Sequence, residues 1–90
     1  MRITIKSKPN YWRFTVYNWL LEIKDILESE LGEKVEITVV EGDNDEPEFY
    51  LNGFFIGMGV PGEEGYLLEI IKKAYYRVKE SNVNVESELN

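Results

Sequence analysis

The dipeptide Asn52-Gly53 stands between two short runs that are rich in aromatic residues. A two-residue type I′ turn requires positive φ at both central positions, and Asn-Gly adopts this turn readily. Between β-forming residues, this pair is the strongest short-range signal for a β-hairpin. We therefore predict two antiparallel strands within residues 47–56. The predicted cross-strand pairs are Leu51–Phe54, Tyr50–Phe55 and Phe49–Ile56.

The spacing of apolar residues predicts the other regular elements. Residues 2–6 and 35–40 alternate apolar and polar side chains, the period of a strand with one solvated face. From Tyr11 to Leu31, apolar side chains recur every three or four positions and form the stripe of an amphipathic helix, which Gly32 ends. The members of this stripe are Trp12, Val16, Trp19, Leu20, Ile23, Ile26, Leu27 and Leu31. A second helix of the same kind is predicted over residues 66–78.

The 90-residue chain contains no cysteine and no histidine. Its length fits one small domain. The composition excludes disulfides and thiolate chemistry, and it removes the side chain that most often serves as a base or metal ligand near neutral pH. The acidic run Asp43–Glu46 lacks the glycine and the spaced carboxylates of a calcium loop. We expect no enzymatic activity, no metal and no cofactor.

Charge is distributed unevenly along the chain, whose formal net charge is −7. Residues 1–13 carry basic side chains only, whereas residues 41–48 are strongly acidic. A negative surface repels phosphate backbones, so we expect no nucleic-acid partner. No apolar run approaches the roughly 20 residues of a membrane-spanning helix, and the start of the chain lacks the apolar stretch of a signal peptide. A cytoplasmic protein without a membrane partner is predicted.

A G-x-G-x-x-G pattern occurs at residues 57–62. In a dinucleotide-binding loop, this pattern follows the first strand of a parallel βαβ unit. Here the preceding strand is the return arm of a hairpin, and Pro61 removes a backbone donor from the loop. Glu63 and Glu64 would also place carboxylates where a pyrophosphate binds. We interpret the glycines as a turn that leads into the last helix.

The predicted elements resemble the thioredoxin fold, in particular its small glutaredoxin-like and selenoprotein-W-like members. The best match is Pro47 ahead of the Asn52-Gly53 hairpin, followed by Gly57 and a helix over residues 64–75. The resemblance implies one α/β domain over residues 1–80, of order βαββα, with a mixed four-stranded sheet and both helices on one face. A polar tail, residues 81–90, would follow. The family also implies a cis peptide bond before Pro47. The alternative is a ferredoxin-like α+β fold with the tail as the last strand.

The chain departs from this family at the redox motif. Family members carry one or two cysteines in the loop between the first strand and the first helix, where this chain reads Ser7-Lys8-Pro9-Asn10. Disulfide exchange is impossible without sulfur, and Ser7 has no neighbouring base. What remains of the family's chemistry is a groove for an extended peptide, which the resemblance places near Pro9, Tyr11 and Pro47.

Two further sets of residues are predicted to form an interaction surface. They are Phe14, Tyr17 and Leu21 on a flank of the first helix, and Val40, Tyr50 and Phe55 on the sheet face that no helix covers. Adjacent exposed apolar side chains mark contact sites, and a second copy, a partner or the tail residues Val83 and Val85 would cover the sheet face. The leading hypothesis is a redox-inactive, non-catalytic interaction module of thioredoxin fold that binds another protein or forms a homodimer. The alternative is a protein that binds a small ligand or thiol peptide in the retained groove.

Overall fold

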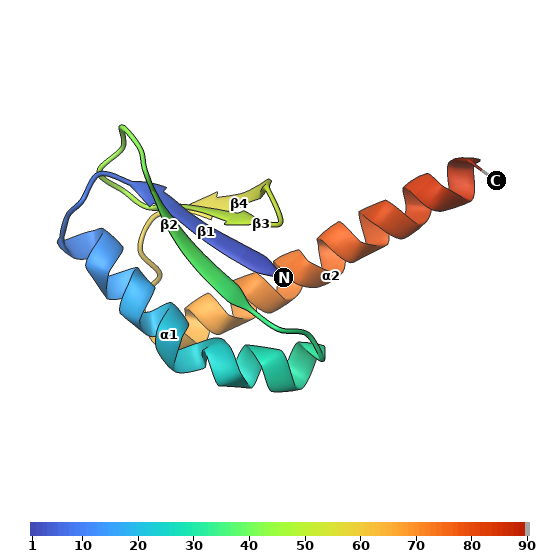
Figure 1. The fold of residues 1–90 in the computed structure, drawn as a ribbon, viewed down its shortest axis with the longest axis horizontal. Helices are drawn as coiled ribbons and strands as arrows, with labels where there is room; N and C mark the ends of the chain where they lie inside the picture. The colour runs from blue at the N-terminus through green and yellow to red at the C-terminus, as the bar shows by residue number, and fades with distance from the viewer. Residues whose placement is uncertain (90) are drawn as a thin grey trace.

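Four strands and two helices make up the computed structural model, which describes the backbone of residues 1–89 and the side chains of residues 1–80 (Figure 1). The elements are β1 (Arg2–Ser7), α1 (Tyr11–Leu31), β2 (Glu36–Glu41), β3 (Glu48–Leu51), β4 (Phe54–Met58) and α2 (Glu64–Leu89). The strands form one sheet in the order β2-β1-β3-β4. β1 pairs with β2 in parallel and with β3 antiparallel, and β3 pairs with β4 antiparallel.

The predicted α/β class and mixed four-stranded sheet are confirmed. The predicted order βαββα is wrong, because three consecutive strands separate the two helices.

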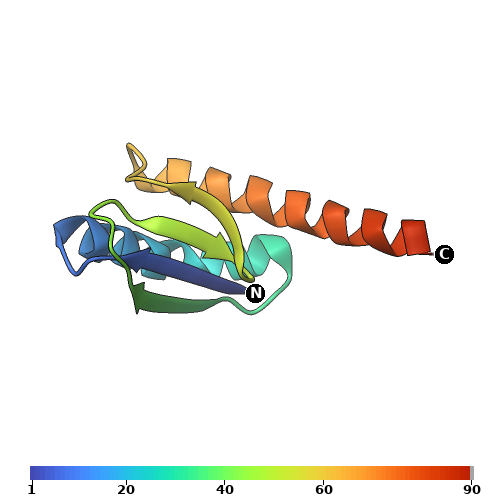
Figure 2. The same ribbon diagram turned by 90° about the horizontal axis from the view of Figure 1, so that it is seen from above.

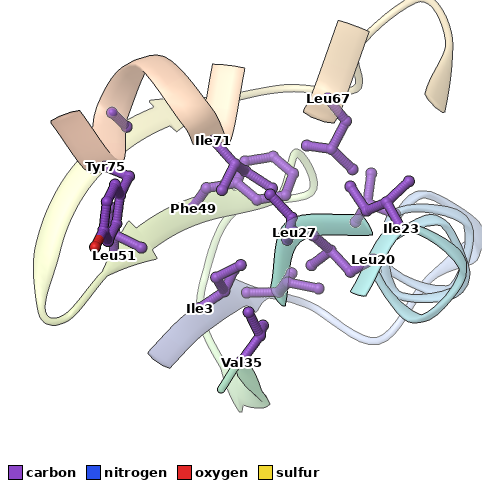
Figure 3. Packing of buried hydrophobic residues seen from close by; sticks show 13 residues of the cluster. Ile3, Leu20, Ile23, Leu27, Val35, Phe49, Leu51, Leu67, Ile71 and Tyr75 are labelled. Atoms are coloured by element: carbon purple, nitrogen blue, oxygen red, sulfur yellow. The ribbon is translucent and has the colours of Figure 1, made fainter. Parts of the chain in front are cut away.

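Both helices pack on one face of the sheet (Figures 1 and 2). β1 and β3 supply the centre of this face with Ile3, Ile5, Phe49 and Leu51, each at most 4% exposed. Figure 3 shows Ile3, Phe49 and Leu51 among the side chains of α1 and α2. The helix residues of the core are Val16, Leu20, Ile23 and Leu27 from α1 and Leu67, Ile71, Ala74 and Tyr75 from α2.

Helix α1 begins and ends where the sequence predicts. The Asn10 side chain accepts a hydrogen bond from the Arg13 backbone N–H at 3.0 Å, which caps the first turn. Gly32 ends the helix with φ 70°, the left-handed conformation that glycine adopts without strain. The predicted burial of Trp12 is wrong, because 49% of this side chain is exposed. Glu64, the first residue of α2, lies close to Glu22 and not to the first turn of α1, so α2 does not cover that turn.

Ile26 also departs from the predicted stripe, since it is exposed at the border of the buried face. Trp19 and Leu31, the other members at this border, pack partly against the core.

Helix α2 is longer than predicted. Its backbone continues to Leu89, where the sequence predicted a polar tail from residue 81. The tail therefore forms no last strand, and the ferredoxin-like alternative is wrong. Figure 1 shows the C-terminal part of α2 extending past the sheet. The proposed cover of the sheet face by Val83 and Val85 lies outside the described side chains.

The hairpin forms at Asn52-Gly53, with φ 49° and 87°. The predicted pairs Leu51–Phe54 and Tyr50–Phe55 are confirmed, but Phe49 pairs with Gly57 and not with Ile56. The extra residue makes a β-bulge in β4. A glycine inside a strand is a frequent companion of such a bulge.

The predicted cis bond at Pro47 is wrong, because the described residues contain no cis peptide. Hydrogen bonds fix the loop before β3 without a cis peptide bond. The Asn44 carbonyl accepts from the Lys8 N–H at 2.9 Å, and the Asp45 carbonyl accepts from the Asn10 side chain at 2.8 Å. The Pro47 carbonyl accepts from the Gly59 N–H at 2.8 Å. These bonds align the chain with β3 in the trans form, which X-Pro bonds favour in most folded proteins.

Candidate interaction surfaces

The sheet face opposite the helices carries an aromatic strip at its β3–β4 side. Tyr50 and Phe55 are cross-strand partners, and their rings meet edge to face with centroids 5.6 Å apart. Met58 pairs with Glu48 on the same face. Phe55 and Met58 are 58% and 55% exposed, and Tyr50 is half-buried. We call Tyr50, Phe55 and Met58 the open-face strip.

Val40, predicted to join this patch, lies apart from it. It belongs to β2, and the row that crosses the sheet from Val40 continues through Lys6 and Glu48 before it reaches Met58. The neighbouring row reads Thr38, Thr4, Tyr50, Phe55. Polar residues of β1 therefore separate Val40 from the open-face strip.

A second apolar surface lies where the first half of α1 passes the outer edge of β2. A hollow of about 340 Å³ is lined here by Pro9, Asn10, Arg13, Phe14, Tyr17 and Val39. Phe14 is 65% exposed, and Val39 is 37% exposed because no strand continues the sheet beyond β2. We call Phe14, Tyr17 and Val39 the edge groove.

The predicted flank of α1 is only partly free. Tyr17 packs against the core, while Leu21 is exposed on the same flank and does not line the edge groove. Phe14 and Leu21 are both exposed, and a contact surface on this flank stays a prediction.

The groove implied by the thioredoxin resemblance is not assembled. Pro47 is fully buried, so it cannot line a surface. Pro9 lies in the edge groove, whereas Tyr11 is 72% exposed and contacts Trp12 edge to face. Ser7, at the position of the family's redox motif, is also fully buried, and its hydroxyl donates to the Lys8 carbonyl at 3.0 Å.

Several basic residues of the N-terminal segment are paired with acids of β2 and the following loop. Arg2 contacts Glu36 at 3.6 Å, Arg13 contacts Glu41 at 3.0 Å, and Lys8 contacts Asp45 at 3.8 Å. Arg13 also donates to the Ser7 carbonyl at 3.3 Å. The Arg13–Glu41 and Lys8–Asp45 pairs therefore connect the basic run of residues 1–13 with the acidic run of residues 41–48.

The titratable groups with shifted pKa values lie in contacts between elements. A hydrogen bond from Tyr75 lowers the pKa of Glu33, and the same bond raises the pKa of Tyr75. Glu30 of α1 raises the pKa of Lys72 of α2 through an ion pair at 2.9 Å. Each shift is explained by a contact between a residue of α2 and a residue of α1 or of the loop after it, so none of these groups indicates a catalytic site. Within the described part of the chain, no three acidic side chains converge as a metal site would require.

Glu22 of α1 and Glu64 of α2 form a like-charge contact. A hydrogen bond from Glu22 raises the pKa of Glu64, because the bond needs a proton on one of the carboxyl groups. Because the pKa of Glu64 is higher in the folded state than in the unfolded state, the contact contributes its full stabilisation of the fold at pH values below the unfolded-state pKa. This stabilisation is lost as the pH rises through the folded-state pKa.

Glu22→Gln is therefore expected to raise the unfolding temperature slightly at pH 7, and the gain should disappear near pH 4. The glutamine amide can donate to the Glu64 carboxylate, which stays at the N-terminus of α2. Thermal unfolding followed by circular dichroism at both pH values measures this effect. Asp25→Asn is the control, since it removes an equal charge from an exposed position of α1. An equal gain in both variants would mean that net charge, and not the Glu22–Glu64 contact, is responsible.

Comparison with known proteins adds no relationship: no family model matches the chain, and no curated protein or solved structure gives a significant match. None of the described helices combines the length and apolar character needed to cross a membrane.

Met58 and Val39 are the surface residues that the sequence analysis missed. The bulge places Met58 beside Phe55, and Gly57 next to it was the available signal. Val39 was expected on the covered face, and it does lie on that face. It is exposed because β2 is an edge strand, a fact about strand order that local sequence does not carry.

Proposed function

We propose that the chain is a non-catalytic protein interaction module that binds a partner protein through the open-face strip. The observation that carries the proposal is that Phe55 and Met58 are exposed, and Tyr50 half-buried, on one sheet face without helices. Aromatic residues and methionine are enriched at protein interfaces. Adjacent exposed apolar side chains of this kind mark a contact site.

The remaining residues favour binding over catalysis. The buried Ser7 hydroxyl is occupied by a backbone carbonyl, and the paired Arg2, Lys8 and Arg13 offer no free basic stripe for nucleic acid. The alternative of a retained ligand groove loses support because Pro47 is buried and trans.

We further propose that the domain is a thioredoxin-like fold without the redox cysteines. Three features support this assignment: a parallel β1–β2 pair joined by α1, the antiparallel β3–β4 hairpin, and a last helix on the same face as α1. The trans bond before Pro47 departs from the family pattern.

The test of the open-face strip compares Tyr50→Ser/Phe55→Ser with the unmodified protein. Each buried aromatic contributes about 1.5–3 kcal/mol, so losing two should weaken partner binding by about 100-fold or more. Tagged protein is purified from cells that express it, co-purified proteins are quantified by mass spectrometry, and the affinity for the identified partner is then measured. Phe55→Ser alone serves as the variant least disturbing to the fold, because Phe55 is mostly exposed.

Phe54→Ser is the matched control for this test. Phe54 is 54% exposed in the same hairpin but pairs with Leu51, whose side chain is in the core, and so lies off the open face. Partner binding that is equal in the unmodified protein, the double variant and this control would contradict the proposed function.

A further inference from the structure

The two edges of the sheet are protected to different degrees. At the β4 edge, the bulge distorts the strand, and Gly59, directly after the strand, has a positive φ of 115°. Bulges, prolines and charges are the devices by which proteins prevent an edge strand from pairing with another chain. At the other edge, β2 has six residues, Glu-Ile-Thr-Val-Val-Glu, with no proline, no bulge and no charge between its ends. β2 is therefore a regular edge that can accept another strand.

The orientation of the free backbone groups of β2 follows from its bonds to the preceding chain. The Glu36 N–H donates to the Met1 carbonyl at 2.8 Å, and the Gly42 N–H donates to the Ser7 carbonyl at 3.1 Å. Because backbone groups alternate sides along a strand, the even-numbered residues face β1. The N–H and C=O groups of Ile37, Val39 and Glu41 face outward.

The acidic side chains at this edge form ion pairs with basic side chains of the same chain. Glu36 and Glu41, the two acids of β2, contact Arg2 and Arg13 of the same chain. An added strand therefore meets four uncharged, β-branched residues between two ion pairs, even though the chain as a whole is strongly acidic. A basic partner segment would find few free carboxylates there, whereas another copy of β2 brings equally paired charges.

We infer that β2 pairs with β2 of a second copy, in antiparallel register centred on Thr38, to form a two-fold symmetric dimer with a continuous eight-stranded sheet. In this register, Thr38 faces Thr38 of the second copy, and the outward-facing Ile37 and Val39 exchange backbone hydrogen bonds with Val39 and Ile37. Glu36 lies opposite Val40, so no like charges meet across the pairing. Cross-strand Thr–Thr and β-branched pairs are stabilising in antiparallel sheets.

The edge groove supplies the side-chain contacts for the added strand. Val39 shares the helix-covered face with Ile37, and it lines the groove with Phe14 and Tyr17. In the inferred register, Ile37 of the second copy lies opposite Val39 and covers this apolar surface. One isologous contact would therefore pair the free backbone N–H and C=O groups of β2 and also cover the exposed apolar side chains of the edge groove.

Thr38→Lys tests the register. It places two lysines directly opposite each other at the symmetry axis, so dimerisation should weaken by at least about tenfold. Thr4→Lys is the matched control, because Thr4 is the neighbour of Thr38 on the same face but belongs to the inner strand β1. Both threonines are only half-buried, so both variants should fold, which circular dichroism verifies. Sedimentation velocity over a range of concentrations measures the dimer. A mixture of Thr38→Lys and Thr38→Glu should restore association.

A crosslink gives an independent measurement, because the chain contains no cysteine of its own. Thr38→Cys should form a disulfide-linked dimer under mild oxidation, while Thr4→Cys should stay uncrosslinked.

A monomeric unmodified protein at millimolar concentration would overturn the inference, and so would equal dimerisation of Thr38→Lys and Thr4→Lys. A dimer that is lost in Tyr50→Ser/Phe55→Ser but kept in Thr38→Lys would place self-association on the open-face strip. The edge inference and the proposed function are thus tested by different residues.

Discussion

Phe49→Ala is expected to lower the free energy of unfolding by about 3–5 kcal/mol. Phe49 is 4% exposed and lies between β3 and α2, where Figure 3 shows it beside Ile71. Truncation removes the largest buried side chain of the hairpin and leaves a cavity that strands and helices on several sides cannot easily fill. Small domains are stable by about 5–15 kcal/mol, so a substantial part of the total stability should be lost.

Urea unfolding followed by the fluorescence of the two tryptophans measures this loss. Phe54→Ala is the matched control, because Phe54 lies in the same hairpin with 54% of its side chain exposed, and it should cost less than about 1 kcal/mol. Similar losses in the two variants would mean that the packing against α2 is not what stabilises the hairpin.

Gly42→Ala is expected to destabilise the protein by about 1–3 kcal/mol, the usual cost of forcing an extra methyl group into a packed site. A Cβ atom at this position would lie 2.8 Å from Cγ of Lys6 and 3.2 Å from the backbone N of Ser7. Cγ is close to the Lys6 backbone and the Ser7 nitrogen is part of β1, so neither can move away without disturbing the strand. The Gly42 N–H bond to the Ser7 carbonyl should lengthen as a result.

Gly57→Ala is the control for this second variant. A Cβ atom at Gly57 meets nothing within 4 Å, and Gly57 is not in the left-handed region. Its thermal unfolding midpoint should match that of the unmodified protein or exceed it slightly, since alanine restricts the unfolded chain. An unchanged midpoint for Gly42→Ala would show that the end of the β1–β2 ladder relaxes at little cost.

The elements that depend on local signals could be predicted from the sequence. Asn10 and Gly32 mark the ends of α1, and Asn52-Gly53 marks the turn of the hairpin; all three act within a few residues. What could not be predicted depends on distant segments. Trp12 has the periodicity of a buried residue, but its exposure depends on where α2 begins.

In the two candidate surfaces, too, some features follow from local sequence and others depend on distant segments. Tyr50 and Phe55 follow directly from the turn, because a two-residue turn determines which residues face each other. The separation of Val40 from them depends on β1 lying between β2 and β3, an arrangement of strands far apart in the chain. The edge groove likewise exists only because β2 ends the sheet.

Asn52 has a second role that concerns the order of folding. Its side-chain oxygen accepts from the Arg2 N–H at 2.8 Å, and its own N–H donates to the Arg2 carbonyl at 2.8 Å, although the two residues are 50 positions apart in the chain. Hairpins close within microseconds, whereas contacts between distant segments form more slowly. We therefore expect the hairpin to exist before β1 joins it. Asn52 in the turn then presents one acceptor and one donor, and only one alignment of β1 pairs with both. The residue that reverses the chain therefore also selects the register in which β1 joins the sheet.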